Sequence, residues 1–205
     1  MTIRFHKGDL PDLTHYDVNA VAIDTETLGL NPHRDRLCVV QISPGDGTAD
    51  VIQIAAGQKK APNLVSILRN RKITKLFHFG RFDLAVLYNA FGVMPEPVFC
   101  SKIASRLTRT YTDRHGLKDL CSELIGVSLS KVQQSSDWAA ETLSPEQLEY
   151  AASDVLYLHR LRDVLSQRLA RDGREAEAAA CFKFLPTRAK LDLMGWDEQD
   201  IFAHS

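Results

Sequence analysis

The sequence predicts an α/β protein in which α-helices flank a mixed β-sheet. Early in the chain, short segments rich in Val and Ile are separated by Gly, Asn, Asp and Pro, which is typical of consecutive strands joined by turns. A helix, a strand and another helix then alternate, as they do around parallel crossovers. The remaining residues mainly show the apolar spacing of helices.

Three strands are expected to form an antiparallel meander. They cover residues 18–25 (VNAVAIDT), 37–43 (LCVVQIS) and 50–54 (DVIQI), and turn-forming residues fill both intervals. The alternating part should follow with a helix, a strand and a helix at residues 62–69, 75–78 and 81–91. The two patterns together predict the mixed sheet.

The strongest helix signal covers residues 144–171. Ser144 is a good N-cap, Pro145 suits the first helical position, and Gln147 completes a capping box. Apolar residues then recur at helical spacing, and Gly173 fits the end of the helix. Further helices are expected at residues 101–107, 117–124 and 175–184.

The 205 residues are expected to form a single domain, with a core at about residues 18–170 and a helical tail at about residues 174–205. The segment from Leu191 onward carries several large apolar side chains. These side chains need a partner, which is either the body of the domain or another subunit.

The composition excludes several classes of protein. Hydrophobic residues make up 44% of the chain and charged residues 25%, which fits a globular protein and not a disordered or fibrous one. No apolar run approaches the roughly 18 residues of a membrane helix, and the first residues show no secretory signal. The four cysteines are scattered without a CxxC motif, so we expect buried free thiols and a cytoplasmic protein.

The charge pattern argues against a globally positive surface for holding nucleic acid, because the net charge is -1. Basic residues nevertheless gather at residues 69–81 and 101–118. Each group is either a solvated face or a rim that faces phosphate groups.

Asp24 and Glu26 stand at the end of an apolar strand. Side chains two residues apart on a strand point to the same face, so these two carboxylates should lie side by side. A bound divalent cation would compensate their repulsion. The alternative is a strand end that runs into solvent, with Glu26 hydrated.

Two more aspartates lie at helical positions. Asp83 falls in the first turn of the helix that follows Gly80, where it could simply favour the positive end of the helix dipole. Asp154 lies close to the apolar stripe of the helix at residues 144–171, where an unpaired carboxylate is costly. Tyr150 precedes it by one turn on the same face, and a core aromatic is the alternative for this tyrosine.

The set and order of these residues resemble the DEDD exonuclease superfamily. Its three motifs correspond, in chain order, to Asp24 with Glu26, to Asp83, and to Asp154 preceded by Tyr150, the mark of the tyrosine subclass. Residues 131–158 also resemble the matching stretch of ribonuclease D, so the likeness covers about residues 18–170.

Two features differ from ribonuclease D. Bacterial ribonuclease D carries additional helical RNA-binding domains, for which this chain is too short. Residues 27–32 (TLGLNP) instead look like oligoribonuclease, in which a leucine at the position of Leu30 wedges between two bases. This combination is similar to the nanoRNase C group of dinucleotide-degrading exonucleases, although Leu30 could also be an ordinary turn residue.

The resemblance implies an RNase H-like fold, two divalent cations (Mg²⁺ or Mn²⁺), and 3′-5′ cleavage of very short RNA, dinucleotides above all. Two cations can offset the charges of the attacking and leaving oxygens in phosphodiester hydrolysis. In this reading Asp24 bridges both cations, and Glu26 and Asp154 hold the first. Asp83 then holds the second, and Tyr150 orients the attacking water.

Substrate-binding candidates extend beyond the carboxylates. Leu30 would separate the bases, and His78 and Arg81 could hold the terminal phosphate beside the second motif. Gln134 and Trp138 could line the scissile nucleotide, although Trp138 is equally expected in the core.

Alternatives remain open. A general ribonuclease D-like enzyme would trim longer RNA or DNA in the 3′-5′ direction. A binding or scaffold module would usually have lost one of the four carboxylates, all of which are present. The resemblance also implies a homo-oligomer in the form of an octameric ring, and the short apolar runs argue against a membrane partner.

Overall fold

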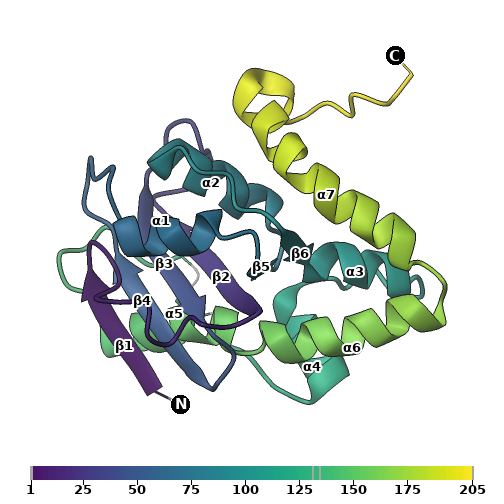
Figure 1. Cartoon of the computed structure of the whole chain (residues 1–205), viewed down its shortest axis with the longest axis horizontal. Helices are drawn as coiled ribbons and strands as arrows, with labels where there is room; N and C mark the ends of the chain where they lie inside the picture. Colours follow the sequence, from purple (N-terminus) through teal and green to yellow (C-terminus); the bar gives the residue numbers. More distant parts are fainter. Residues whose placement is uncertain (1, 131, 134, 205) are drawn as a thin grey trace.

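The computed structural model describes residues 2–130, 132–133 and 135–204. At its centre lies a six-stranded sheet with the order β1-β4-β3-β2-β5-β6 (Figure 1). The strands are, in chain order, β1 (Thr2–Lys7), β2 (Ala20–Thr27), β3 (Leu37–Ser43), β4 (Thr48–Gln53), β5 (Thr74–Phe77) and β6 (Val98–Cys100).

The pairing confirms the predicted mixed sheet. Strands β2, β3 and β4 form the antiparallel meander, while β5 pairs parallel with both β2 and β6. Strand β1 pairs parallel with β4 and was not predicted. It lies at the edge of the sheet and alternates apolar with charged residues over only six positions (TIRFHK), which is a weak signal.

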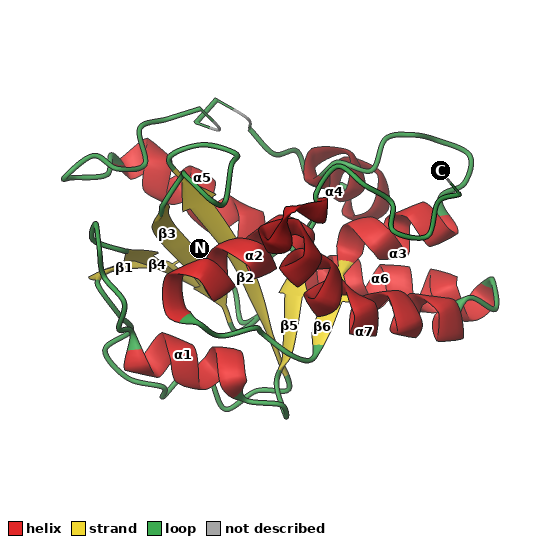
Figure 2. Ribbon diagram, turned by 90° about the horizontal axis from the view of Figure 1, so that it is seen from above, coloured by secondary structure: helices red, strands yellow, loops and turns green. Residues whose placement is uncertain are grey.

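Helices cover both faces of the sheet. They are α1 (Pro62–Arg69), α2 (Arg81–Phe91), α3 (Ser101–Thr108), α4 (Leu117–Ile125), α5 (Pro145–Leu156), α6 (Leu158–Arg171) and α7 (Glu175–Leu191). Helices α1 and α2 pack on one face and α5 on the other, as the view from above shows (Figure 2). Each face therefore encloses its own apolar cluster.

The single helix predicted for residues 144–171 is wrong in one respect, because it is two helices. The chain breaks at Tyr157, which has φ -106° and ψ -4°. Before the break, α5 packs on β2, β3 and β4; after it, α6 packs on α3 and α4. The two packing surfaces require different directions of the chain. The predicted N-cap at Ser144 and its capping box with Gln147 are confirmed.

Helix α7 continues beyond the predicted end at Phe184 and contains Pro186. A proline inside a helix removes one backbone hydrogen bond. Here Leu185, Pro186 and Ala189 are buried, and α7 packs against α2 and α3, so tertiary contacts sustain the helix.

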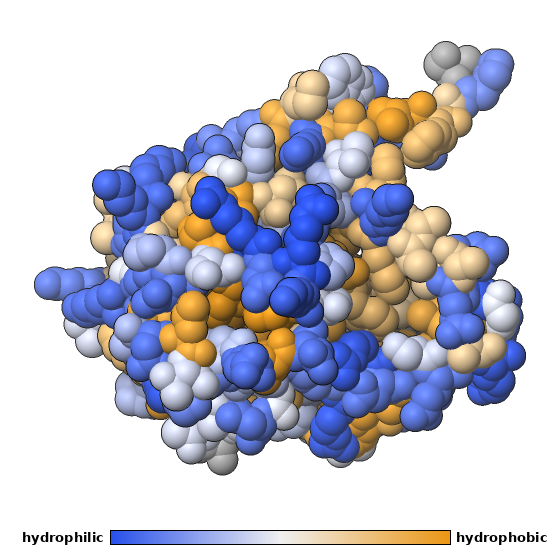
Figure 3. Space-filling model, viewed as in Figure 1, coloured by the Kyte–Doolittle hydropathy of each residue, from blue (hydrophilic) through white to orange (hydrophobic). Residues whose placement is uncertain are grey.

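The chain after α7 forms a π-helical turn (Asp192–Trp196), with Gly195 at φ 102°. Apolar surface gathers over this end of the molecule (Figure 3), where Met194 and Phe202 are exposed. The expectation of buried thiols is confirmed for three cysteines and is wrong for Cys181, which lies on the outer side of α7. Within the described residues, no helix has the length and apolar character needed to cross a membrane.

Asp50 on β4 joins the edge of the sheet to the first loop. Its buried carboxylate accepts hydrogen bonds from Arg4 (2.7 Å) and from the hydroxyl of Tyr16 (2.5 Å), and it lies 2.7 Å from His6 Nε2. The hydrogen bonds and the charge of Arg4 overcome the effect of burial and lower the pKa of Asp50.

Replacing Asp50 by Ala should lower the free energy of unfolding by about 3 kcal/mol, because the half-buried guanidinium of Arg4 and the buried hydroxyl of Tyr16 lose their partner. Urea denaturation measures this change. The matched control is Asp163→Ala, which removes an exposed ion pair with Arg162 and should cost less than about 1 kcal/mol. Equal losses in both variants would contradict the expectation.

Candidate active site

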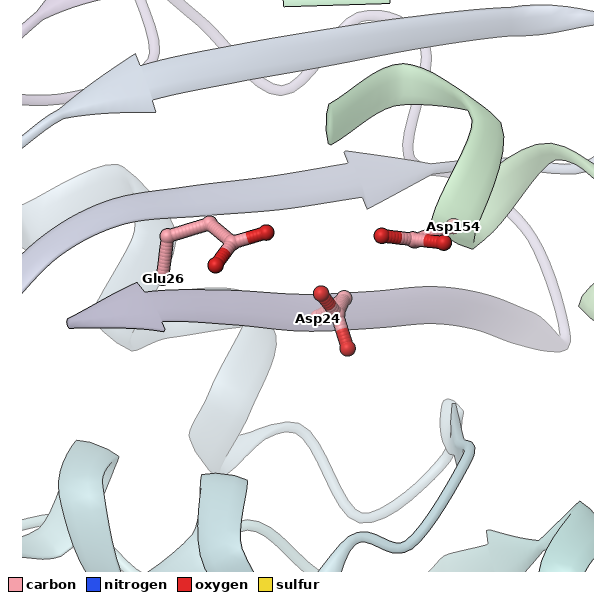
Figure 4. A group of neighbouring side chains, drawn as sticks. All are labelled: Asp24, Glu26 and Asp154. Carbon is pink, nitrogen blue, oxygen red and sulfur yellow. The ribbon is translucent and has the colours of Figure 1, made fainter. Parts of the chain in front are cut away.

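Three carboxylates meet between the sheet and α5. Asp24 and Glu26 project from β2 and Asp154 projects from α5 toward them (Figure 4). One oxygen from each lies within 4.8 Å of the others. The sequence prediction that Asp24 and Glu26 lie side by side is therefore confirmed.

Local structure explains this meeting. Residues 24 and 26 share one face of β2, and α5 covers that face. The small buried residues Ala151 and Ala152 let α5 approach the sheet closely. The capping box at Ser144 fixes where the helix begins and hence which residue reaches the strand.

Asp83 reaches the site from the other side of the sheet. Strand β2 pairs with β5 only from Ala20 to Ala22, so the rest of β2 has no strand neighbour on that side. The first turn of α2, which contains Asp83, lies beside this part of β2. The buried Asp83 Oδ1 accepts a hydrogen bond of 2.7 Å from Thr25 Oγ1. Asp83 is thus held beside the other three carboxylates but not within their 4.8 Å group.

Burial raises the pKa of all four carboxyls, and repulsion from the neighbouring carboxylates adds to the rise for Asp24, Glu26 and Asp154. For Asp24 burial is the main cause of the raised pKa, followed by the charges of Asp83, Asp154 and Glu26. Burial and the neighbouring Asp154 raise the pKa of Glu26 to about 9. Burial raises the pKa values of Asp83 and Asp154 to about 7, against the hydrogen bonds from Thr25 and Tyr150 respectively.

The donor set fits divalent cations. Four carboxylates offer oxygen ligands of the kind that Mg²⁺ and Mn²⁺ prefer. Within the described residues, none of the four forms an ion pair with Lys, Arg or His. The protein therefore leaves this negative charge uncompensated, and a bound cation would compensate it.

The raised pKa values predict that metal binding depends on pH. Protons compete with the cation for carboxylates whose pKa values are about 7 to about 9, so the cation binds more weakly at low pH. The increase in Tm that Mg²⁺ produces, measured against EDTA, should grow from about pH 6 to about pH 9. A Mg²⁺-induced increase that is the same across this range would contradict the prediction.

Tyr150 lies one helical turn before Asp154 on the same helix, and its hydroxyl acts to lower the pKa of that carboxyl. Burial, together with the charges of Asp154, Glu26 and Asp24, raises the pKa of its hydroxyl further above 10. The phenol therefore stays protonated at neutral pH. It can donate or accept a hydrogen bond, but it is a poor base.

Leu30 lies on the turn after β2, with 88% of its surface exposed. The preceding Gly29 makes this turn possible, because a Cβ at Gly29 would lie 2.4 Å from Asp35 Oδ2. Leu30 and Phe79 line one cavity of about 220 Å³. Phe82 and Ala85 also line it, and such an apolar wall suits a nucleobase.

Phe79 was missed by the sequence reasoning. Its φ of 62° is unusual for a residue other than glycine, its ring is 45% exposed, and Lys102 Nζ lies 4.4 Å from the ring centroid. Strained backbone of this kind often occurs at functional sites. The only signal in the sequence was its position beside His78 in the second motif.

Arg81 is held by the C-terminal segment. Its Nε donates to Asp192 Oδ2 at 2.5 Å, and its Nη2 donates to the Asp197 carbonyl at 2.6 Å. Arg188 contacts the same carboxylate at 2.6 Å. Arg81 lines the cavity with Leu30, so a phosphate role stays a prediction, but part of its guanidinium is already engaged.

The remaining substrate candidates are placed differently. His78 Nδ1 lies 2.9 Å from Ser101 Oγ, and burial lowers its pKa to about 3, so its ring is neutral. Trp138 is buried in the core against Tyr150, with ring centroids 6.0 Å apart, as the core alternative expected. Gln134 lies outside the described residues.

The basic segments at residues 69–81 and 101–118 are neither entirely exposed to solvent nor entirely a rim that faces phosphate groups. Lys75 is buried and donates to the carbonyls of Asn70 (2.5 Å) and Glu96 (2.7 Å). Arg109 is also buried and pairs with Glu123. Both residues serve the fold, which charge counts along the sequence could not reveal.

Fold and site together define a class: a mixed sheet with carboxylates on a central strand, on the facing helix and at the adjacent helix start is the arrangement of the DEDD exonucleases. Residues 13–170 match the model of a family described as 3′-5′ exonuclease. The chain belongs to this 3′-5′ exonuclease family, and the predicted RNase H-like fold is confirmed.

Relatives sharpen this assignment. Ribonuclease D of Acidiphilium cryptum is 35% identical over 154 residues, which cover 75% of this chain and 39% of that protein. The chain thus spans less than half of the curated relatives it matches. The structures of Brucella melitensis NrnC with bound Mg²⁺ and bound to pGG are similar over 100% of both chains. Their identities are 78% and 80%, with TM-scores of 0.97 and 0.98.

Proposed function

We propose that the protein is a metal-dependent 3′-5′ exoribonuclease that hydrolyses very short RNA, above all dinucleotides, to nucleoside 5′-monophosphates. The observation that carries this proposal is the carboxylate cluster on β2 and α5, next in sequence to the turn that exposes Leu30. The full-length similarity to NrnC bound to pGG supports the choice of substrate.

Two divalent cations, Mg²⁺ or Mn²⁺, fit the four carboxylates. We assign Asp24 to both cations, Glu26 and Asp154 to the first, and Asp83 to the second. When bound, such cations stabilise the charges of the attacking and leaving oxygens in phosphodiester hydrolysis.

The chain's own groups position the reactants. Water attacks the phosphorus and gives up a proton to solvent, the bond to the 3′ oxygen of the preceding nucleotide breaks, and that oxygen takes up a proton from solvent. Tyr150 remains protonated, so its hydroxyl orients the water by a hydrogen bond rather than removing its proton. Thr25 holds the Asp83 carboxylate in place.

The cavity lined by Leu30 and Phe79 would hold the bases of a short substrate. A 5′-phosphorylated dinucleotide offers only two bases, one linking phosphate and one terminal phosphate, so apolar contacts must supply much of its affinity. Stacking on an aromatic ring contributes about 1–3 kcal/mol per base. His78 and Arg81 remain the candidates for the terminal phosphate.

The decisive experiment compares cleavage of 5′-labelled RNA of two and of seven nucleotides, with Mg²⁺ or Mn²⁺. Preference for the dinucleotide, with the longer RNA barely shortened, is the expected result. Comparable stepwise shortening of both would favour the second candidate, a general ribonuclease D-like exonuclease acting on longer RNA or DNA. The matches to ribonuclease D support that candidate.

Leu30→Ala should raise KM for a dinucleotide about 10-fold, which corresponds to about 1.4 kcal/mol of lost apolar contact. Since Leu30 is 88% exposed, Tm should not change. The matched control is Leu28→Ala, which removes another exposed leucine two residues earlier and should leave KM unchanged. If both variants behave like the parent protein, the wedge role of Leu30 is wrong.

We further propose a homo-oligomer, an octameric ring, in the cytoplasm. The exposed apolar side chains of the C-terminal segment support an interface between subunits: Met194, Trp196, Ile201 and Phe202. Light scattering of the purified protein would measure the number of subunits, and a monomer at micromolar concentration would contradict the proposal.

A further inference from the structure

Gln41 is a buried amide without a hydrogen-bond partner. It lies in the middle of β3 with 0% of its surface exposed. In the described part of the chain, neither its Oε1 nor its Nε2 makes a hydrogen bond. An unsatisfied buried polar group costs about 1–3 kcal/mol, so its presence calls for an explanation.

The register places Gln41 directly opposite Asp24. Strands β2 and β3 are antiparallel, with Asp24 paired to Gln41. Side chains at paired positions share one face, and their Cβ atoms lie about 4.5–5.5 Å apart. Rotation about the Gln41 side-chain torsions can therefore bring its amide toward the Asp24 carboxylate, on the face of the sheet that α5 covers.

The other neighbour set by strand pairing offers no partner, because on the other side of β3 Gln41 is paired with the apolar Val51. Of the buried residues of α5, Ala151, Ala152 and Val155 have side chains that cannot form hydrogen bonds. The amide of the fourth, Gln147, is already engaged with the backbone of Ser144 and Asp137. Among the neighbours set by strand pairing, Asp24 alone carries a side chain that can accept a hydrogen bond from the amide.

We infer that Gln41 is a positioning residue for the metal site, and that its Nε2 donates a hydrogen bond to Asp24 when the carboxylates hold divalent cations. This inference rests on the proposed function. A carboxylate that holds a cation must be ionised and fixed in orientation. A hydrogen bond donated by the Gln41 amide to Asp24 would favour the ionised form and fix the orientation of the carboxylate. Groups that support metal ligands in this way typically change metal affinity about 10- to 100-fold when they are removed.

The test is a titration of Mn²⁺ against Tm, without substrate. Gln41→Met keeps the length and unbranched shape of the side chain but removes its hydrogen-bonding groups. Without metal, this variant should be as stable as the parent protein or more so by about 2–4 °C, because an unsatisfied amide has been removed. The Mn²⁺ concentration for half of the Tm increase should rise about 10-fold.

The matched control is Gln53→Met on β4, whose amide already donates to the Ala140 carbonyl at 2.8 Å. The Gln53→Met variant should have a lower Tm without metal, and the Mn²⁺ concentration for half of its Tm increase should stay unchanged. Gln41→Leu serves as a second variant with the same expected signs. An unchanged midpoint in the Gln41 variants, or a lower Tm without metal, would overturn the inference. No Mn²⁺ response in the parent protein would instead overturn the proposed function.

Discussion

Asp24→Asn is expected to abolish metal-dependent hydrolysis and to leave a folded protein that is more stable without metal. Asn keeps the shape of the side chain but removes the charge that both cations would share. A loss of about 10⁴-fold in kcat/KM corresponds to about 5.5 kcal/mol of transition-state stabilisation. The dinucleotide assay with Mg²⁺ measures it.

Stability should change in the opposite direction. Burial and three neighbouring carboxylates raise the pKa of Asp24, so the ionised form is unfavourable in the metal-free protein. Removing this group should stabilise the metal-free protein by on the order of 1 kcal/mol, as often happens when functional groups are replaced. Asp163→Asn, on the exposed face of α6, is the control and should change neither property. A stable Asp24→Asn variant with full turnover would refute the site assignment.

Tyr150→Phe should lower kcat roughly 10²-fold while KM and the Mn²⁺-induced increase in Tm stay nearly unchanged. The hydroxyl is assigned to orienting water, not to holding cations or bases. Since it stays protonated across the neutral range, the variant should lose activity by a similar factor at pH 7 and at pH 9. Single-turnover rates at both pH values measure this.

The control for this variant lies on the same part of the chain. Tyr157 is half-buried at the break between α5 and α6, and Tyr157→Phe should keep full activity. If Tyr150→Phe also kept full activity, the orienting role would be wrong. A changed metal response would mean that Tyr150 supports Asp154 instead.

Local signals predicted most of the fold. The capping box at Ser144 and the turn residues between the strands act over a few residues, so they can be identified directly in the sequence. The break at Tyr157 could not be predicted in this way, because it arises from the different surfaces against which α5 and α6 pack. The predicted end of the last helix at Phe184 is wrong for the same reason, since buried contacts sustain α7 through Pro186.

In the site, too, some features follow from local sequence signals and others do not. Strand alternation predicts that Asp24 and Glu26 lie side by side, and helical spacing links Tyr150 to Asp154. The positive φ of Phe79 and the register between Asp24 and Gln41 involve backbone conformation and strand pairing, which residue types alone do not specify. Arg81 appeared free for a phosphate until the fold brought Asp192 to it.

The ion pair between Arg81 and Asp192 also bears on how the protein is made. These residues are separated by 111 positions, and Arg81 begins the helix that carries Asp83. During translation, the start of α2 therefore lacks its partner until the C-terminal segment has left the ribosome. The start of α2 therefore gains its full set of contacts only after residue 192 has been synthesised, much later than the strands on which α2 packs.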